Sequence, residues 1–341
     1  MKVLIVGLGS MGKRRIRNLK VLGVTDIRGF DLREDRRQEA TDKYGIATFN
    51  NLDKALDYGP DAVIISLPPD LHVPYANKVL DHRIPFFTEA SVVTDGLPEL
   101  IDRLQDLKAL GVPSCTMRYY AGPRRLKKII HDGSIGKPLA WTYHSGQHLL
   151  DWHPWEPIQS YYVSKKATGG CREILAFELV WLVDLFGGIA QVDCQKDKLS
   201  DLPTEIDDLY QLQIRHLNGI RGQLMVDVLA RPAVRLIRVV GSAGTVEWDA
   251  TQKIVRYFSS AANAWVRDDL GAGTIEKGYV NPEEPYIEEM ADFLSCISER
   301  RSPTYSFEED LSILRILQSA EESDNLGTRI RIEERAEQVR Q

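Results

Sequence analysis

The first residues whose spacing suits a particular chemistry are three glycines near the start of the chain. Gly7, Gly9 and Gly12 follow the apolar run KVLIV in the pattern G-x-G-x-x-G. In this pattern the first glycine allows a tight turn, the second lets a pyrophosphate approach the backbone, and the third lets a helix pack closely on a strand. A helix starting at Ser10, with Met11 in its first turn, would direct free N–H groups at the phosphates.

An acidic residue follows at the distance that a dinucleotide site requires. Asp31 ends the second predicted strand, 19 residues after Gly12. Its carboxylate would accept hydrogen bonds from an adenosine ribose, which favours NAD over NADP. Arg33 lies two residues further on and would tolerate a 2′-phosphate, so NADP stays possible. The alternative is a glycine turn that binds no nucleotide.

Two further predicted strands end in residues that we expect beside the cofactor. The fourth strand runs into SLPPDLH, which contains Ser66, Pro68 and His72, and the fifth is followed by Glu89. Prolines cannot donate backbone hydrogen bonds and would stiffen the loop after the strand. A lone histidine such as His72 is also explained as a capping or packing residue.

The segment 147–168 is rich in aromatic and basic side chains of the kind that bind sugars. Aromatic rings stack on the C–H face of a sugar, and polar groups bind its hydroxyls. The substrate-binding candidates in this segment are His148, Trp152, Tyr162 and Lys166. Tyr119, which lies earlier in the sequence, is a further substrate-binding candidate. The alternative is a long loop packed by its own aromatic residues. Zinc is a further alternative, but His144, His148, Asp151 and His153 lack a tight ligand spacing, so we predict no metal site.

Three residues are candidates for proton transfer: Glu173, His153 and Lys165. Glu173 lies one helical turn before Phe177, so both side chains project from the same face, which we expect to look into the cofactor crevice. Burial there would raise the pKa of Glu173 towards the range of a general base. The alternative is a carboxylate that is favoured at a helix N-terminus by the helix dipole. Glu178 points away from this face and is expected to pair elsewhere.

The elements that must position these residues fall into two groups. Over residues 1–120, six short β-rich runs alternate with helical patterns, which predicts a Rossmann fold with a doubly wound parallel sheet. Over residues 121–341, consecutive strands with a hairpin turn at Asn218-Gly219 predict an α/β domain with an open, mainly antiparallel sheet. We expect this second domain to bind the substrate and to mediate oligomerisation.

Composition excludes several functions for the 341-residue chain. Its net charge of −6 gives no nucleic-acid footprint, and the cluster Lys13–Arg15 is expected to be a solvated helix face. No apolar stretch reaches membrane-spanning length, and the opening MKVLIVGLG lacks the length and cleavage site expected of a signal peptide. The cysteines are far apart and without a C-x-x-C pair, which predicts free thiols in the cytoplasm. Leu224, Val226 and Val228 place an apolar stripe on one side of a strand, which predicts a homodimer or homotetramer.

These motifs resemble the Gfo/Idh/MocA oxidoreductase family over nearly the whole chain. The matching stretches are GLGSMG, SLPPDLH, FFTEASVV, IIHDGSIGKPLAW and REILAFELVWLVDLFG. The resemblance implies a Rossmann domain joined to a C-terminal α/β domain with an open sheet. It also implies NAD(P)-dependent oxidation or reduction of a hydroxyl or carbonyl group on a carbohydrate or sugar nucleotide.

The pattern departs from the family at the positions that carry its acid/base chemistry. Ala90 occupies the place of the family's lysine, and Phe177 occupies the place of its histidine. Glu89 is kept, and Glu173 takes the place of a carboxylate four residues before that histidine. Two functions remain open: an oxidoreductase with an atypical acid/base set, or a non-catalytic family member that binds NAD and a sugar as a sensor or complex subunit.

Overall fold

The computed structural model describes residues 1–152, 157–160, 162–260, 262–271, 273–276 and 281–332, and it divides into two compact units. Unit 1 consists of Met1–Thr116 and Gly273–Ser312, and unit 2 consists of Met117–Ala272 and Ile313–Gln341. The chain therefore leaves unit 1 after Thr116 and returns to it at Gly273. The functional division at residue 120 stays a prediction.

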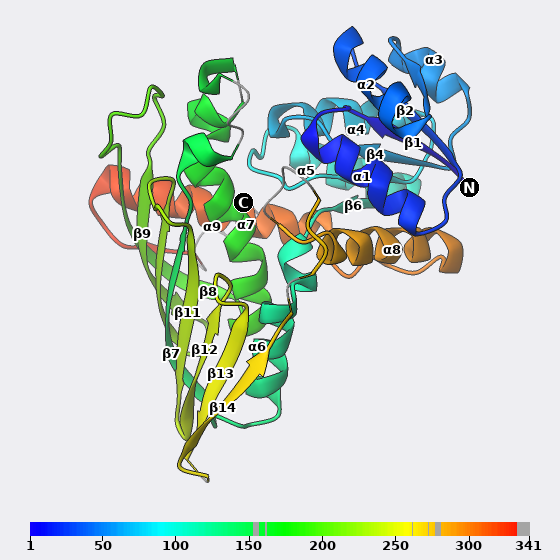
Figure 1. Cartoon of the computed structure of the whole chain (residues 1–341). Helices are drawn as coiled ribbons and strands as arrows, with labels where there is room; N and C mark the ends of the chain where they lie inside the picture. The colour runs from blue at the N-terminus through cyan, green and yellow to red at the C-terminus, as the bar shows by residue number, and fades with distance from the viewer. Residues whose placement is uncertain (153–156, 161, 261, 272, 277–280, 333–341) are drawn as a thin grey trace. The chain divides into compact units, whose positions relative to one another are not determined.

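In the described part of unit 1, six parallel strands form one sheet in the order β3-β2-β1-β4-β5-β6. The strands are β1 (Lys2–Val6), β2 (Asp26–Phe30), β3 (Ala47–Phe49), β4 (Ala62–Ile65), β5 (Phe86–Thr88) and β6 (Gly111–Pro113). The helices are α1 (Ser10–Val21), α2 (Glu34–Tyr44), α3 (Leu52–Asp57), α4 (His72–Asp81), α5 (Leu97–Leu107) and α8 (Glu284–Glu299), with a 3-10 turn η1 (Pro69–Leu71). Figure 1 shows helices on both sides of this sheet, which confirms the predicted Rossmann fold.

The core of unit 1 explains why α8 belongs to it. Strands β1 and β4 are apolar along nearly their whole length, as expected of parallel strands that are covered on both faces. Met290 and Phe293 of α8 are fully buried in the same cluster as Ile5 and Ile64. The ring of Phe293 also lies 5.8 Å from that of Phe87 on β5. A helix from the end of the sequence thus completes the core of the N-terminal sheet.

In the described part of unit 2, nine strands form a sheet in the order β14-β13-β12-β11-β7-β10-β9-β8-β15. The strands are β7 (Pro138–Gly146), β8 (Ile189–Asp197), β9 (Leu209–His216), β10 (Arg221–Asp227), β11 (Val234–Gly241), β12 (Gly244–Asp249), β13 (Ile254–Ser259), β14 (Ala264–Asp269) and β15 (Ile330–Arg331). Only the β7–β10 pair in this sheet of described residues is parallel, so the prediction of a mainly antiparallel sheet is confirmed. The predicted hairpin turn is present too, because Gly219 has φ +89° between β9 and β10.

The helices of unit 2 cover one face of its sheet. They are α6 (Ala121–His131), α7 (Gly170–Phe186) and the part of α9 (Phe307–Leu326) that follows Ser312. Figure 1 shows α6 and α7 on the same side of the strands. Leu224, Val226 and Val228 are at most 2% exposed, and α7 packs on β10 from this side. The prediction that their stripe is free for a second copy is therefore wrong, because the chain's own helix covers it.

The segment that was predicted as an aromatic-rich loop contains short 3-10 turns in its described residues. They are η3 (Leu149–Asp151), η4 (Ile158–Ser160), η5 (Tyr162–Ser164) and η6 (Lys166–Thr168), and a further turn, η2 (Thr116–Tyr119), precedes α6.

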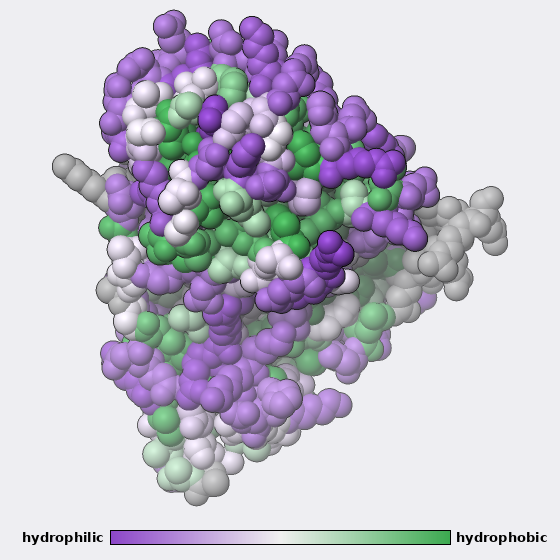
Figure 2. Space-filling view, turned by 90° about the vertical axis from the view of Figure 1, so that its right-hand side faces the viewer, coloured by the Kyte–Doolittle hydropathy of each residue, from purple (hydrophilic) through white to green (hydrophobic). Residues whose placement is uncertain are grey.

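None of the described helices is both long and apolar enough to cross a membrane. On the face drawn in Figure 2, hydrophilic side chains line the upper rim and hydrophobic side chains gather below it.

Candidate functional site

The glycine turn between β1 and α1 is shaped by close backbone contacts. Gly7 has φ +95°, and a Cβ atom there would lie 2.4 Å from the carbonyl oxygen of Ser66. A Cβ on Gly12 would lie 1.9 Å from the carbonyl oxygen of Gly7, so α1 can approach β1 only without a side chain. At Gly9, by contrast, the nearest atom to such a Cβ is 3.5 Å away. The backbone is therefore tightly packed at Gly7 and Gly12, whereas Gly9 leaves space for a ligand to approach the backbone.

The N-terminus of α1 fits an anionic group at this open position. Gly9 is the N-cap residue and provides no side chain, and the first turn of the helix has no acidic residue. The first N–H groups of a helix have no partner within the helix and carry its positive dipole end. Ser10 and Met11 thus occupy the first turn, as predicted, and the geometry suits the pyrophosphate of a dinucleotide.

Asp31 braces the glycine turn from the end of β2. Its Oδ2 accepts a hydrogen bond from the Leu8 amide at 2.8 Å, and its Oδ1 accepts one from the Arg33 amide at 2.9 Å. The residue is 7% exposed. Because each carboxylate oxygen has a second lone pair, Asp31 can still accept a hydrogen bond from a ribose hydroxyl.

A cation that the sequence analysis missed lies beside this carboxylate. Arg36, in the first turn of α2, places Nη1 3.8 Å from Oδ2 of Asp31 and 3.5 Å from the position of a Cβ on Gly9. Arg33 instead pairs with Asp35, 2.6 Å from Nη2 to Oδ2, and that hydrogen bond lowers the pKa of Asp35 to about 2. Arg36, and not Arg33, is therefore the side chain recorded next to Gly9. Its only sequence signal is its position near Asp31 in the run REDRR.

Glu89, after β5, is held in a buried ion pair. Arg15 donates to Oε1 from Nε at 2.8 Å and to Oε2 from Nη2 at 2.7 Å, and the Ser66 hydroxyl donates to Oε1 at 2.8 Å. Burial alone would raise the pKa of Glu89, but Arg15 and Ser66 outweigh it and hold the pKa below its ordinary value. The carboxylate is therefore ionised and fixed, and it ties the ends of β4 and β5 to α1.

The basic cluster on α1 is not a solvated face, so that prediction is wrong for two of its three residues. Arg14 is 3% exposed and Arg15 is fully buried. Arg14 donates to Glu283 at 3.0 Å, and Arg15 donates to Glu289 at 2.8 Å. Both carboxylates come from the far end of the chain, at the N-terminus of α8 and within it, and a local sequence window gives no sign of them.

His72 and Pro68 form the loop that follows β4. The carbonyl oxygen of Leu67 lies 2.8 Å from Nε2 of His72 and can only accept, so Nε2 carries the proton. Burial lowers the pKa of His72, which keeps the ring neutral. Pro68 precedes the turn η1. His72 thus closes its own loop, and a contact with the cofactor stays a prediction for both residues.

Glu173 and Tyr162, both predicted site residues of unit 2, are joined by a hydrogen bond between their side chains. The Tyr162 hydroxyl donates to Oε1 of Glu173 at 2.7 Å. Oε2 is buried and has no hydrogen-bond partner in the described part of the chain. Burial raises the pKa of Glu173 to about 7, even though the hydrogen bond from Tyr162 lowers it. A carboxyl group with this pKa can both accept and donate a proton near neutral pH.

The remaining predicted residues of unit 2 that the structure describes have other contacts. Trp152 donates from Nε1 to the Gln147 carbonyl at 3.3 Å, and His148 accepts from the Leu150 amide through Nδ1. Tyr119 lies under the Arg124 guanidinium, 5.2 Å from its ring centre. Lys165 and Lys166 are exposed. His153 lies outside the described residues, and the site roles of all six residues stay predictions.

The helix that carries Glu173 directs another carboxylate into the core. Glu178 is fully buried and accepts hydrogen bonds from the side chains of Tyr143, Ser145 and Trp181, and it pairs with Arg235 at 3.0 Å. The prediction that it pairs away from Glu173 is confirmed. Its acceptor capacity is used, so Glu178 is a structural carboxylate.

Of the four residues considered as zinc ligands, the structure describes His144, His148 and Asp151, whereas His153 lies outside the described residues. Across the ranges that the structure describes, no group of three or more His, Cys, Asp or Glu residues has the arrangement of a metal site. His144 instead pairs with Asp227, 2.6 Å from Nε2 to Oδ2, and Asp151 pairs with Arg231 at 2.7 Å.

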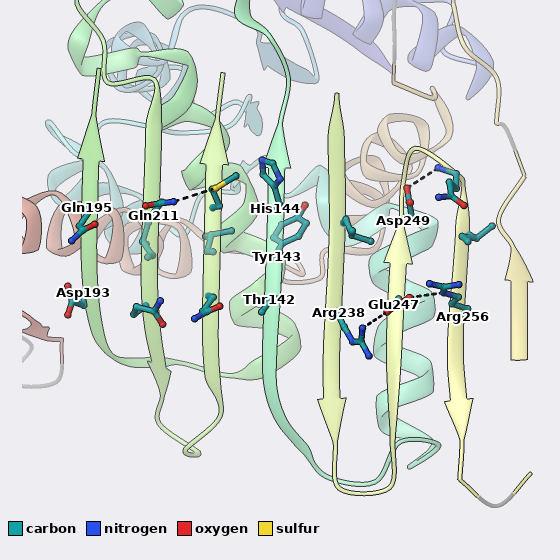
Figure 3. A pocket seen from close by; sticks show the side chains of 18 residues that line it. Thr142, Tyr143, His144, Asp193, Gln195, Gln211, Arg238, Glu247, Asp249 and Arg256 are labelled. Carbon is teal, nitrogen blue, oxygen red and sulfur yellow. Dashed lines mark hydrogen bonds and ion pairs between the residues drawn. The ribbon is translucent and has the colours of Figure 1, made fainter. Parts of the chain in front are cut away.

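The face of the unit 2 sheet away from its helices carries a shallow depression of about 840 Å³. The lining residues come from strands β7 to β13, and Figure 3 draws their side chains. Gln195, Gln211 and His144 lie on β8, β9 and β7, and Glu247 on β12 binds Arg238 and Arg256 at 3.3 and 2.6 Å. The depression is polar, and most of the residues that line it have no acid/base function. We therefore do not treat it as a candidate active site.

Two protein-family models match the sequence. Residues 1–109 match the model described as an oxidoreductase family with an NAD-binding Rossmann fold, and residues 124–247 match the Gfo/Idh/MocA C-terminal domain. A curated relative, 2,7-anhydro-N-acetylneuraminate hydratase from Mediterraneibacter gnavus, is 25% identical over 148 residues. That alignment covers 43% of this chain and 35% of the relative, so it spans about a third of the relative's length.

Two solved structures share the fold over nearly the whole chain. An oxidoreductase from Agrobacterium radiobacter, in complex with NAD+, L-tartaric acid and magnesium, has a TM-score of 0.85 at 15% identity and covers 97% of this chain and 98% of its own. Levoglucosan dehydrogenase in complex with NADH has a TM-score of 0.83 at 17% identity, with 97% and 99% covered. At these identities the similarity shows the fold alone.

Proposed function

Because the chain belongs to the Gfo/Idh/MocA family of oxidoreductases, whose first domain has an NAD-binding Rossmann fold, we propose that it is an NAD-dependent oxidoreductase. The proposed substrate is a hydroxyl or carbonyl group of a carbohydrate or sugar nucleotide. Glu173 is the proposed acid/base, because Ala90 and Phe177 replace the lysine and histidine that the family pattern implies. The observation that carries this proposal is Oε2 of Glu173, which is buried and has no hydrogen-bond partner among the described residues, in a carboxyl group whose pKa burial raises to about 7.

The names of two similar proteins support a carbohydrate as the substrate class. One is named as a hydratase of 2,7-anhydro-N-acetylneuraminate, and the other as a dehydrogenase of levoglucosan. Both compounds are sugars that carry several hydroxyl groups. The aromatic and polar side chains of Tyr119, His148, Trp152 and Lys166 suit such a ligand, since rings and hydrogen-bonding groups are what a sugar requires.

NAD, when bound, supplies the nicotinamide ring that accepts or returns a hydride. The amides at the start of α1 bind the phosphates, and Asp31 accepts a hydrogen bond from the adenosine ribose. Glu173 takes the proton of the substrate hydroxyl on Oε2 while Tyr162 holds Oε1. In the reverse direction the protonated Glu173 returns that proton to the carbonyl oxygen. His153 and Lys165 are the next candidates for this role.

The proposed preference is for NAD over NADP. Asp31 supports it, because a carboxylate repels a 2′-phosphate and accepts hydrogen bonds from a 2′-hydroxyl. Arg36 works in the opposite direction, because its guanidinium lies 3.8 Å from that carboxylate and can bind a phosphate. NADP therefore stays an accepted second cofactor in this proposal.

A second candidate function is a non-catalytic protein that binds NAD and a sugar as a sensor or complex subunit. The observation that favours it is the state of Glu89, which is ionised and held by Arg15 and Ser66, next to Ala90. No proton-transfer group is thus available at this place in the sequence, and Glu173 has to supply the whole acid/base function.

The decisive experiment measures NADH formation by absorbance with the full chain, NAD and a panel of sugars, anhydrosugars, sugar acids and sugar nucleotides. We expect at least one member of the panel to be oxidised. Glu173→Gln should then lower turnover by about 10²–10⁴-fold with little change in NAD affinity. The control is Glu205→Gln, an exposed carboxylate of the same unit. Tight NAD binding with no turnover on any panel member would support the non-catalytic function instead.

We further propose a homodimer or homotetramer in the cytoplasm. The open face of the unit 2 sheet supports an oligomer, since Leu236 and Val240 are each 42% exposed there. The four cysteines are buried free thiols, which supports a reducing compartment. Light scattering coupled to size exclusion tests the assembly, and a monomeric mass would overturn it.

A further inference from the structure

A histidine and an aspartate outside the predicted site are paired at the ends of two neighbouring strands. His144 lies on β7 and Asp227 on β10, and these strands run parallel with Asp227 opposite Gly146. Nε2 of His144 lies 2.6 Å from Oδ2 of Asp227. A Cβ on Gly146 would lie 2.5 Å from the same oxygen, so the glycine leaves room for the pair. Figure 3 places His144 near the end of its strand.

The other oxygen of Asp227 builds a turn. Oδ1 accepts hydrogen bonds from the amides of Leu229 and Ala230 at 2.8 and 2.7 Å. Burial would raise the pKa of Asp227, but the hydrogen bonds from His144 and the two amides outweigh it and lower the pKa. An ionised carboxylate can only accept, so His144 carries its proton on Nε2 and donates. Hydrogen bonds to an ionised group are about twice as strong as neutral ones.

The turn after Asp227 in turn holds the segment 147–152. The amides of Gln147, His148 and Leu149 donate to the carbonyl oxygens of Asp227, Ala230 and Val228 at 3.3, 2.9 and 3.0 Å. Arg231 adds a two-pronged ion pair with Asp151, at 2.9 and 2.7 Å. Three successive amides of the segment and the side chain of Asp151 thus have partners on the turn, so the position of the turn sets that of the segment.

The same segment packs on the first turn of α7. A Cβ on Gly170 would lie 2.8 Å from a methyl carbon of Leu149 and 3.4 Å from the ring of Trp152. Gly170 is three residues before Glu173, so both lie on one face of the helix. The segment therefore packs on the same face of α7 that carries the buried carboxyl group.

We propose that His144 and Asp227 form a positioning pair, which holds the segment 147–152 on the first turn of α7 and thereby keeps Glu173 out of water. Neither residue is assigned to the substrate or to the cofactor. The naming of Glu173 as the acid/base rests on the proposed function, whereas the holding of the segment does not.

The test uses the full chain without cofactor or substrate and compares His144→Ala with His144→Gln. Hydrogen exchange should become about 10-fold faster in the segment 147–149 of the alanine variant, as expected when a charge-assisted hydrogen bond is lost. The infrared band of the protonated Glu173 carboxyl, assigned with Glu173→Gln, should titrate at a lower pH than in the unmodified chain. Glutamine can donate from a similar position, so His144→Gln should restore both properties.

Thr142→Ala is the matched control, because Thr142 lies on the same strand and the same open face two residues earlier. It should change neither measurement. If His144→Ala does not fold, His144→Leu replaces the ring by an apolar side chain and carries the same expectation. Unchanged exchange and an unchanged Glu173 titration in the folded variant would overturn the proposal, as would equal effects in Thr142→Ala. A failure to find NADH formation would bear on the proposed function and leave this result untouched.

Discussion

The guanidinium group of Arg15 holds both oxygens of the Glu89 carboxylate, with Nε and Nη2 at 2.8 and 2.7 Å. The same Nη2 lies 2.8 Å from Oε2 of Glu289 on α8. Glu289 is further bound by the hydroxyls of Ser114 and Thr116. One buried cation thus joins the first helix, the end of β5 and a helix from the far end of the sequence.

Arg15→Met should destabilise unit 1 strongly. The substitution keeps much of the side-chain volume but leaves two carboxylates buried without a cation, and breaking a buried ion pair in this way costs about 3–5 kcal/mol. Urea unfolding measures the change in the free energy of unfolding. Arg33→Met is the control, because its pair with Asp35 is exposed to solvent and contributes little to stability. Equal losses in the two variants would contradict the prediction.

Tyr162→Phe should raise the pKa of Glu173 above its value of about 7. The tyrosine donates to the carboxylate at 2.7 Å, and a hydrogen bond to the charged form stabilises that form. Without it the carboxyl holds its proton to higher pH, and the pH profile of sugar oxidation should move in the same direction. Infrared titration of the carboxyl checks this, with Tyr257→Phe as the control. A lower midpoint would show that Tyr162 does not act on Glu173 as a donor.

Cofactor preference should change in opposite directions when Asp31 and Arg36 are replaced. Asp31→Ala should weaken NAD binding more than NADP binding, because only NAD has a 2′-hydroxyl for the carboxylate. Arg36→Ala should weaken NADP binding about 10-fold more than NAD binding, since a charge-assisted contact to phosphate is lost. Fluorescence titration with both cofactors measures the two ratios, and Arg33→Ala serves as the control. A larger effect of Arg33→Ala would return the phosphate contact to that residue.

Stability should fall as pH rises through the titration of Asp310. Burial raises the pKa of this carboxyl to about 6, even though hydrogen bonds from Ser91 and Tyr305 lower it. The folded state therefore holds the proton more tightly than the unfolded state, where the pKa is about 3.9. Its contribution is complete below about pH 4 and is lost as pH rises past 6, with a size of roughly 3 kcal/mol.

Asp310→Asn should remove this pH dependence and leave the variant more stable than the unmodified chain above about pH 7. The measurement is the free energy of unfolding in urea at a series of pH values. Asp106→Asn, at an exposed position on α5, is the matched control. Parallel curves for Asp310→Asn and the unmodified chain would show that Asp310 does not titrate with this shift.

Local patterns were sufficient to predict the elements and the NAD-binding fold. The spacing of Gly7, Gly9 and Gly12 after an apolar strand is a local signal, and the family model over residues 1–109 confirms the fold that it predicted. The contacts of Arg15 could not be predicted, because its partners Glu89 and Glu289 lie 74 and 274 residues away. A basic run looks the same in sequence whether water or carboxylates surround it.

The orientation of strand β10 shows the same limit in unit 2. The alternation of Leu224 and Val226 predicted one apolar side correctly, yet period two does not tell which side the helices cover. The sequence indicated Tyr162 as a substrate-binding candidate but did not indicate that it contacts Glu173. Their hydrogen bond depends on how the turns of residues 158–168 fold back on α7. The pair of His144 and Asp227 had no sequence signal, because its members lie on separate strands.

The discontinuity of unit 1 has a consequence for the order in which the protein is made. The ribosome synthesises the first 116 residues, which include the glycine turn, long before it reaches Glu283 and Glu289. Arg14 therefore emerges before Glu283, and Arg15 emerges with Glu89 but before Glu289, while the strands from β7 to β14 are synthesised in between. The nascent Rossmann sheet has to wait for α8, so it matures after most of unit 2 has left the exit tunnel. A chain that stopped near residue 120 would contain the Arg15–Glu89 pair but neither Glu283 nor Glu289.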